Sequence, residues 1–183
     1  MNPFPELIPQ LDIGGEKLVF KKVSKEQYEK DLVKTGNDVE KAMLYDNLVL
    51  PIRSTVGSAG YDFITPIDIE LSLGEMKFIP TGIKCKLPDF CVLLEYPRSG
   101  LGFKYGISFL NTVGIIDSDY YNNKDNEGHI MLGIRFNGGL NKESKFIAKK
   151  GERICQGIIM PFYITDNDNV SVKRTGGLGS TGK

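Results

Sequence analysis

Residues 67–87 read IDIELSLGEMKFIPTGIKCKL, a stretch in which short apolar runs are separated by Gly and Pro. Runs of this length and composition are typical of β-strands joined by tight turns. No alternation of strands with long helices follows, which argues against nucleotide-binding α/β folds. Instead, the segments CVLLEYP (91–97), IMLGIRF (130–136), SKFIAKK (144–150) and RICQGIIMPFYI (153–164) repeat the pattern. The sequence therefore predicts a mainly β domain, an antiparallel barrel or sandwich.

The N-terminal part is predicted to be helical. After a β-prone run, KLVFKKVS, Ser24 and Gln27 have capping-box spacing, and apolar residues recur at helical spacing until Gly36. Asn37 and Glu40 repeat the cap and predict a second short helix. At 183 residues the chain suits one domain. We therefore expect a single domain over 1–183, with a helical insert at 24–46 and a flexible C-terminal arm at 173–183.

Composition excludes several classes of function. Lys plus Arg and Asp plus Glu both total 23, so no basic field favours nucleic acid or membrane as a partner. No apolar run is long enough to span a membrane and no signal peptide is apparent, which predicts a cytoplasmic protein. The three cysteines lie among apolar neighbours, as reduced buried thiols do. His129, the one histidine, stands in the polar stretch KDNEGH and is interpreted as a solvated loop edge.

The C-terminal letters GGLGSTGK have the Gly-x4-Gly-Lys spacing of a P-loop. A P-loop also needs a hydroxyl residue after its Lys and a helix to stabilise the phosphates, but Lys183 is the last residue of this sequence. The remaining interpretation is a Gly-rich arm with hydroxyls at Ser180 and Thr181 and cations at Lys173 and Arg174. Such an arm suits an anion that another part of the protein holds.

The segment PRSG after the strand at 91–97 has the elements of a phosphate cradle. Arg98 supplies a planar fork of donors, Ser99 a hydroxyl, and Gly100 a backbone amide that an anion can approach closely. The alternative is an ordinary turn with a surface salt bridge. Asp62 is predicted to pair with an Arg rather than bind a ligand. In GERICQG, Gln156 has an amide for a phosphate, whereas Arg153 is equally suited to fixing a loop.

The segment GIIDSDY carries the strongest chemical signal. An apolar strand entry delivers Asp117 and Asp119, and strand alternation predicts both carboxylates on one face, with Tyr120 directly after them. Asp117 has the chemistry to orient and deprotonate a water molecule, and Tyr120 a ring to lie against a sugar or base. The alternative is an Asp-rich turn beside a core Tyr.

Five segments in this order resemble the five motifs of the trimeric dUTPase family. They are SAGYDF (58–63), PRSGLGFK (97–104), NTVGIIDSDY (111–120), GERICQG (151–157) and the tail GGLGSTGK (176–183). The resemblance covers about two thirds of the chain. It implies a jelly-roll-like antiparallel β-barrel and a homotrimer with active sites where subunits meet. It also implies hydrolysis of dUTP to dUMP and pyrophosphate, with Mg²⁺ bound mainly to the substrate phosphates.

The resemblance also implies a role for each matching residue. Asp117 would activate the water that attacks the α-phosphorus. Tyr120 would pack on the deoxyribose and exclude a 2′-hydroxyl. The uracil edge would be read by a hairpin with Asn111, Gly114 and Ile116. The phosphates would be held by Arg98, Ser99, Gly100 and Gln156, and by the arm residues Arg174, Leu178, Gly179, Ser180 and Thr181. Asp62 and Arg153 would support the site, and Asp62 is placed to reach the metal through water.

The sequence departs from the family pattern at several places. Leu178 stands where the family has a Phe over the uracil, and one residue is missing before the Gly pair. Either Lys173 or Arg174 can therefore meet the γ-phosphate, and we favour Arg174 because its planar guanidinium offers a fork of donors to phosphate oxygens. The polar segment YNNKDNEGH (121–129) replaces a shorter continuation and is interpreted as a tolerated surface insertion, with gating or partner contact as the alternative. The insert at 24–46 has no assigned function; trimer packing and decoration fit it equally.

Two rival functions remain. A dCTP deaminase shares the fold, but its proton-shuttling Glu would fall at Gly133 in this sequence. A non-catalytic regulatory or binding module on the same scaffold is the other rival, and Leu178 with the polar segment at 121–129 are the features that favour it.

Overall fold

The computed structural model describes residues 18–172, 174, 176 and 177. Every strand pair in it is antiparallel, which confirms the predicted mainly β class. All of the apolar runs named above form strands. The strands are β1 (Val19–Lys22), β2 (Ile52–Arg53), β3 (Tyr61–Ile64), β4 (Ile69–Ser72), β5 (Met76–Pro80), β6 (Ile83–Lys86), β7 (Cys91–Pro97), β8 (Ile107–Phe109), β9 (Gly114–Ile116), β10 (Met131–Phe136), β11 (Lys145–Ala148) and β12 (Arg153–Pro161).

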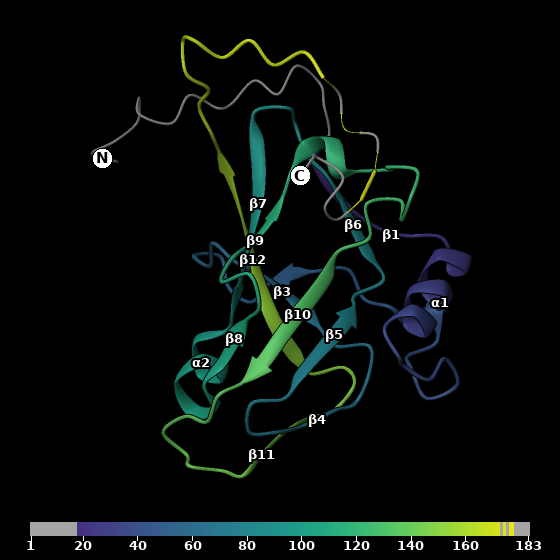
Figure 1. Cartoon of the computed structure of the whole chain (residues 1–183), viewed down its shortest axis with the longest axis vertical. Coiled ribbons are helices and arrows are strands. Elements are labelled where there is room, and N and C mark those ends of the chain that lie inside the picture. The colour runs from purple at the N-terminus through teal and green to yellow at the C-terminus, as the bar shows by residue number, and fades with distance from the viewer. Residues whose placement is uncertain (1–17, 173, 175, 178–183) are drawn as a thin grey trace.

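The largest sheet has the order β2-β3-β12-β7-β9. Facing it is a three-stranded sheet, β5-β10-β8, and two further pairs, β1-β6 and β11-β4, complete the β structure. In Figure 1 the long strands β7 and β12 run along the length of the molecule, and α1 lies against one side of the sheets. Within the described residues, no helix is long and apolar enough to cross a membrane.

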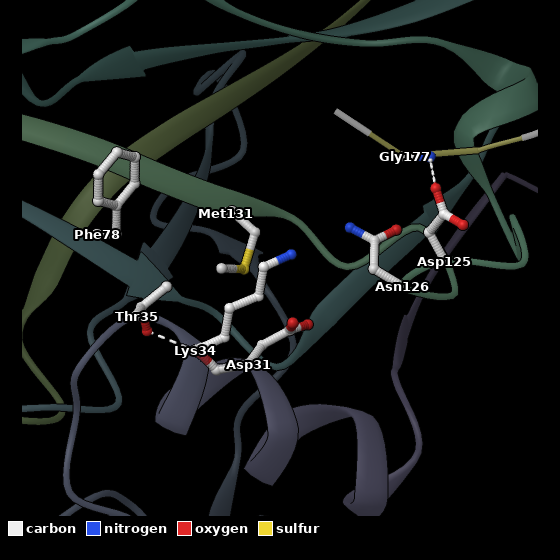
Figure 2. Close-up of a pocket in the computed structure, with 8 residues that line it drawn as sticks. All are labelled: Asp31, Lys34, Thr35, Phe78, Asp125, Asn126, Met131 and Gly177. Carbon is white, nitrogen blue, oxygen red and sulfur yellow. Dashed lines mark hydrogen bonds between the residues drawn. The ribbon is translucent and has the colours of Figure 1, made fainter. Parts of the chain in front are cut away.

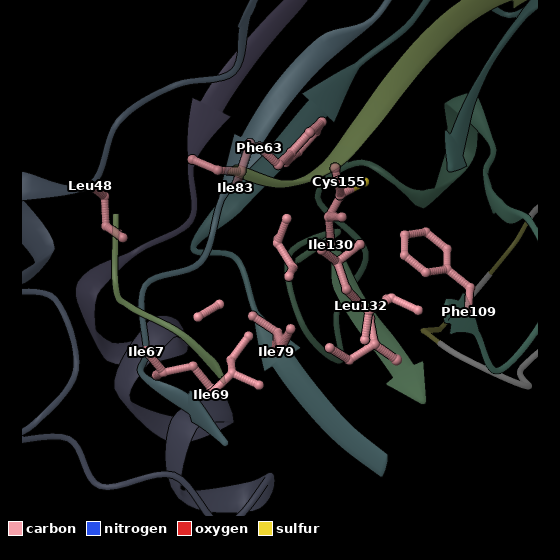
Figure 3. Close-up of a cluster of buried hydrophobic side chains, with 14 of the residues drawn as sticks. Leu48, Phe63, Ile67, Ile69, Ile79, Ile83, Phe109, Ile130, Leu132 and Cys155 are labelled. Carbon is pink, nitrogen blue, oxygen red and sulfur yellow. The ribbon is translucent and has the colours of Figure 1, made fainter. Parts of the chain in front are cut away.

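The core lies between these sheets and follows strand alternation. In β10 the side chains of Leu132, Ile134 and Phe136 are buried, whereas the alternate residues between them are more exposed. Figure 3 shows aliphatic side chains from several strands meeting Phe63 and Cys155 in one cluster. All three cysteines are free and buried, as predicted. Burial, with a contribution from the nearby Glu95, raises the pKa of Cys85 to about 12, so this thiol is unreactive at neutral pH.

Helix α1 (Lys25–Lys34) begins where the capping pattern predicts. The Ser24 hydroxyl accepts a hydrogen bond from the Gln27 backbone amide at 3.1 Å. The predicted second helix after Asn37 is wrong. The Asn37 side chain donates to the Phe78 carbonyl of β5 at 3.2 Å rather than capping a helix, and turns follow it. The next helical segment is a 3-10 turn, η1 (Tyr45–Asn47).

Helix α2 (Ser99–Tyr105) was not predicted, because its sequence, SGLGFKY, contains glycine and no apolar stripe. It ends at Gly106, whose φ of 66° lies in the left-handed region. A Cβ at Gly106 would overlap the backbone of Gly138, so the position also requires glycine for close packing. The helix follows directly on β7 and sets the direction in which the chain leaves Arg98.

Glu95 of β7 is an ionisable group inside this core. It is 1% exposed, and its Oε1 has no hydrogen-bond partner among the described residues. Burial disfavours the charged form and raises the pKa of Glu95 to about 8. The carboxyl group is therefore mostly protonated at neutral pH in the folded protein.

This predicts a pH dependence of stability that Glu95→Gln removes. Below the ordinary pKa of 4.5 the group is protonated in both states. Between that value and about 8 only the unfolded chain releases the proton, so the free energy of unfolding falls as pH rises. The difference between wild type and Glu95→Gln should change by about 1.4 kcal/mol per pH unit in this window. Denaturant unfolding at a series of pH values measures it, and parallel pH profiles for the two proteins would contradict the assignment.

Candidate active site

Asp62 joins three segments of the largest sheet into a cluster of charged side chains. Its Oδ1 accepts from Arg98 Nε at 3.1 Å, and its Oδ2 accepts from Arg153 Nη1 at 3.0 Å and from the Ser54 hydroxyl at 2.6 Å. The contacts follow from strand order, because β12 lies between β3, which carries Asp62, and β7, which ends just before Arg98. The predicted pairing of Asp62 with an Arg is confirmed, and Arg153 shares it.

A cavity of about 310 Å³ opens beside this cluster. Arg98, Ser99 and Gln156 line it together with Asp62, so the structure brings these four predicted residues to one place. The Gln156 amide donates to the Pro97 carbonyl at 3.4 Å, a long hydrogen bond that an anionic ligand can replace. Ser99 and Gly100 form the first turn of α2, where backbone N–H groups lack intrahelical acceptors. We call Asp62, Arg98, Ser99, Gly100 and Gln156 the anion cradle.

Asp117 belongs to a second cluster. Strand β9 ends at Ile116, and η2 (Ser118–Tyr120) follows, so the strand alternation predicted for Asp117 and Asp119 is wrong. The two carboxylates nevertheless share one cation. Arg174 Nη2 donates to Asp117 Oδ2 at 2.6 Å, and Arg174 Nε donates to Asp119 Oδ1 at 2.9 Å. The guanidinium also lies 5.7 Å from the centre of the Tyr120 ring, a cation–π distance.

Tyr120 is 5% exposed and held at its edge. Its hydroxyl donates to the His129 carbonyl at 3.0 Å and accepts from Asn126 Nδ2 at 2.6 Å. Burial raises the pKa of Tyr120 despite the hydrogen bond from Asn126, so the hydroxyl stays protonated. In this protomer the ring is therefore a core residue with one face covered by Arg174.

The predicted uracil hairpin connects β8 with β9. Thr112 at its tip has a φ of 66°, and Val113 N donates to the Asn111 carbonyl at 2.7 Å, which closes a tight turn. Gly114 follows and pairs with Glu95 of β7, and Ile116 pairs with Leu93. The hairpin thus presents the backbone after Asn111 at the edge of the largest sheet.

Within one protomer the anion cradle and the cluster around Asp117 lie far apart. Asp117 lies one residue beyond the Leu93–Ile116 pair, level with Val92, whereas Arg98 follows the other end of β7. At the usual strand rise, the six residues from Val92 to Arg98 span about 20 Å. An anion in the cradle is therefore out of reach of Asp117 in the same protomer.

The prediction that His129 is a solvated loop edge is wrong. His129 is fully buried, and its Nδ1 lies 2.7 Å from Asp31 Oδ2. The segment Tyr121–His129, interpreted as a tolerated surface insertion, has exposed residues but is also anchored: Asn123 is buried and Glu127 bonds to the start of α1 at Ser24. A single sequence offers no signal for a partner 98 residues away from His129.

A second cavity, of about 430 Å³, lies between α1 and this segment and was not predicted. Figure 2 shows Asp31 and Lys34 on the helix side, and Asp125 and Asn126 on the other side. The backbone amide of Gly177 donates to Asp125 Oδ2 at 2.8 Å, so this part of the C-terminal arm also reaches the cavity. Lys173, Leu178, Gly179, Ser180 and Thr181 lie outside the described residues.

The fold and these clusters define a class: a β-barrel protein with an anion cradle and a separate acidic turn. The family model for dUTPase matches residues 46–182. Deoxyuridine 5'-triphosphate nucleotidohydrolases of Lactococcus lactis and Paraburkholderia xenovorans are similar to the chain. The first is 45% identical over 136 residues and the second 40% identical over 143, with coverage of 73% of this chain in both cases and 87% and 89% of those proteins.

A crystal structure of dUTPase from Streptococcus mutans superposes with a TM-score of 0.61 at 33% identity, over 81% of this chain and 98% of that one. The chain belongs to the dUTPase family. Its antiparallel sheets form the jelly-roll-like β fold of that family, as predicted from the sequence.

The two site glycines should respond differently to substitution by Ala. A Cβ at Gly114 would lie 2.7 Å from Glu95 Oε2 and 3.0 Å from Glu95 Cβ, inside the core, whereas a Cβ at Gly100 would meet no atom of the described residues within 4 Å. Gly114→Ala should therefore lower the free energy of unfolding by about 1–3 kcal/mol. Gly100→Ala, in the first turn of α2, should leave it nearly unchanged. Thermal denaturation compares them, and equal melting temperatures for both variants would refute the packing role of Gly114.

Proposed function

We propose that this protein hydrolyses dUTP to dUMP and pyrophosphate at sites that are each assembled from more than one copy of the chain. The observation that carries the proposal is the separation of the anion cradle from Asp117 within one protomer of a dUTPase-family chain. A cradle from one copy facing the acidic turn of another would supply both halves of a phosphate-cleaving site. The resemblance to the family adds Tyr120 as the residue that contacts the deoxyribose.

Asp117 is proposed as the base. Its carboxylate is half-exposed and follows β9 directly, so the sheet fixes its backbone while the side chain faces solvent. It would orient a water molecule in line with the bond to the leaving pyrophosphate. The water oxygen bonds to the α-phosphorus, the bond to pyrophosphate breaks, and the water proton passes to Asp117. Positioning of this kind supplies most of the catalysis in phosphoryl transfer.

The cradle would hold the phosphate chain. Arg98 lines the cavity and uses Nε for Asp62, so its two terminal nitrogens would bind phosphate oxygens. Ser99 and the Gln156 amide add neutral donors that orient the chain. Because Asp62, which is itself bonded to Arg153 and Ser54, holds Arg98 through its Nε, little ordering would be needed when the phosphates bind.

The donor set fits Mg²⁺ carried by the substrate. Among the described residues, no group of three or more His, Cys, Asp or Glu side chains is arranged to hold a metal ion, and both oxygens of Asp62 are already bonded. Mg²⁺ usually keeps several waters and takes its remaining ligands from substrate phosphates. When bound, it would neutralise charge on the triphosphate. Asp62 would contribute at most through a water molecule.

The outer face of the largest sheet supports an assembly of identical chains. Ile115 is 62% exposed and Met160 is 44% exposed, and the cross-strand neighbours Val92, Leu94 and Ile158 lie on the same face. An exposed apolar face of this kind often marks a surface that contacts another protein chain. In this proposal the cradle of one copy meets Asp117 of the next in a head-to-tail contact, and such contacts form a ring when the rotation between copies closes. We propose the homotrimer of the family.

Arg174 is proposed to change partners when substrate binds. Within one protomer its guanidinium holds Asp117 and Asp119, two carboxylates that a triphosphate can replace. The same arm would then meet the γ-phosphate through Arg174, Gly179, Ser180 and Thr181, with Leu178 over the base. The cytoplasmic location expected from the sequence remains a prediction.

Deamination of dCTP is disfavoured by local packing. A Cβ at Gly133 would lie 3.0 Å from Leu110 Cδ1 and 3.2 Å from Phe78 Cε1. The longer side chain of a proton-shuttling Glu would need both neighbours to move. The position expected for that acid is therefore crowded in this chain, and the sequence places no carboxylate there.

Asp117→Asn should lower kcat for dUTP by about 10²–10⁴, because the amide cannot accept the water proton. The KM should change little, since the cradle rather than Asp117 would hold the phosphates. Pyrophosphate release at saturating dUTP measures the effect. Asp119→Asn is the matched control. It removes the other carboxylate that pairs with Arg174, and its kcat should fall far less. Normal turnover by Asp117→Asn would refute the assignment.

Mixed assemblies test whether the sites are shared. Arg98→Ala and Asp117→Asn should each be nearly inactive, but unfolding and refolding them together in equal amounts should restore about a quarter of wild-type activity, because half of the cradles and half of the acidic turns are intact and pair at random. Arg98→Ala refolded with Gln156→Ala is the control, since both changes lie in the cradle. Recovery no greater than in this control would show that each protomer works alone.

A further inference from the structure

Helix α1, which belongs to the helical insert, is bonded to the segment Tyr121–His129 at two points. At its start, Ser24 N and Oγ donate to the two oxygens of Glu127 at 3.0 and 2.5 Å, and Lys84 Nζ lies 3.0 Å from Glu127 Oε2. At the other point, Asp31 meets His129 inside the protein. The insert therefore packs against the segment that directly follows the acidic turn.

The contact between Asp31 and His129 has a defined direction. The Gly82 backbone N–H can only donate, and it lies 2.7 Å from His129 Nε2, so Nε2 is the acceptor. The ring proton is then on Nδ1 and is donated to Asp31 Oδ2 at 2.7 Å. Burial acts to raise the pKa of Asp31, but hydrogen bonds from His129 and Gln27 outweigh it and hold that pKa below its usual value. A neutral imidazole is thus locked between a backbone amide and a carboxylate.

This pair is continuous with Tyr120. The carbonyl of His129 accepts the Tyr120 hydroxyl at 3.0 Å, and Asn126 Nδ2 donates to the same hydroxyl at 2.6 Å. Fixing the His129 ring therefore fixes the backbone oxygen that holds the edge of the Tyr120 ring. Asp31 and Asn126 also face the 430 Å³ cavity from opposite sides, as Figure 2 shows.

We infer that Asp31 and His129 are positioning residues for Tyr120, and that the helical insert thereby sets the discrimination between 2′-deoxy and 2′-hydroxy substrates. The inference rests on the proposed function, in which Tyr120 packs on the sugar. Excluding a single oxygen atom requires a ring held within about 0.5 Å of its place. Within the part of the chain that the structure describes, the Tyr120 hydroxyl bonds only to the segment that α1 holds, so release of His129 would let the ring move.

The test compares kcat/KM for dUTP and for UTP. Asp31→Ala leaves the Nδ1 proton of His129 without its acceptor, and the dUTP/UTP ratio should fall about tenfold. Asp31→Asn keeps an oxygen that accepts from Nδ1 and should retain most of the ratio. Tyr28→Phe is the matched control on the same helix: it removes the hydrogen bond from Tyr28 to the Met43 carbonyl, which has no link to Tyr120, and should leave the ratio unchanged.

Should Asp31→Ala not fold, Asp31→Ser also removes the carboxylate and leaves a polar group at the site. A double-mutant cycle with Tyr120→Phe provides a second readout, because Phe lacks the hydroxyl that donates to the His129 carbonyl. If Asp31 acts through Tyr120, the two losses of ratio are not additive, and the double variant resembles Tyr120→Phe alone. A lowered melting temperature with an unchanged dUTP/UTP ratio, or additive losses, would overturn the inference.

The wild-type protein separates this inference from the proposed function. Equal turnover of dUTP and UTP by wild type would overturn the inference but leave dUTP hydrolysis intact. Absence of dUTP turnover by wild type would refute the proposed function itself.

Discussion

The register of β7 against its two neighbours is the constraint on which the site depends. Pairing with β12 brings Gln156 beside the residues that precede Arg98, and pairing with β9 places Asp117 level with Val92. Since strands are stiff and their rise is fixed, the distance between cradle and acidic turn cannot be adjusted by side-chain motion. Under the proposed function the site therefore needs a second copy of the chain, and the exposed apolar side chains on the outer face of the same sheet are the surface proposed for that contact.

Charge in this protein is balanced locally as well as overall. Asp62 holds two arginines, Arg98 in the cradle and Arg153 beside it, and Arg174 holds two aspartates at the acidic turn. Neither cluster has a large excess of one sign, which agrees with a formal net charge of zero. A highly charged ligand would then bind by replacing one partner in ion pairs that the protein already forms. Affinity would come from positioned donors rather than from a long-range field.

The insert and the segment that follows the acidic turn form one unit. Ser24 with Glu127 and Asp31 with His129 join residues about 100 positions apart, and a buried carboxylate of this kind is tolerated because its hydrogen bonds are made. Removal of one partner would leave the other buried and unsatisfied, which costs far more than a surface contact does. The insert is thus joined to the site by hydrogen bonds whose loss would lower the free energy of unfolding.

Local patterns in the sequence determined the mainly β class, the strand runs, the Ser24 cap, the buried cysteines and the residues of the cradle and acidic turn, because alternation, capping and turn chemistry act over a few residues. Other features were decided only by tertiary structure. Asn37 bonds to β5 instead of capping a helix, α2 forms from a glycine-rich segment, and His129 is buried. Each depends on a partner distant in the chain, and a single sequence does not encode such pairings in any local pattern. For the same reason the separation of Arg98 from Asp117 became visible only once the strand register was known.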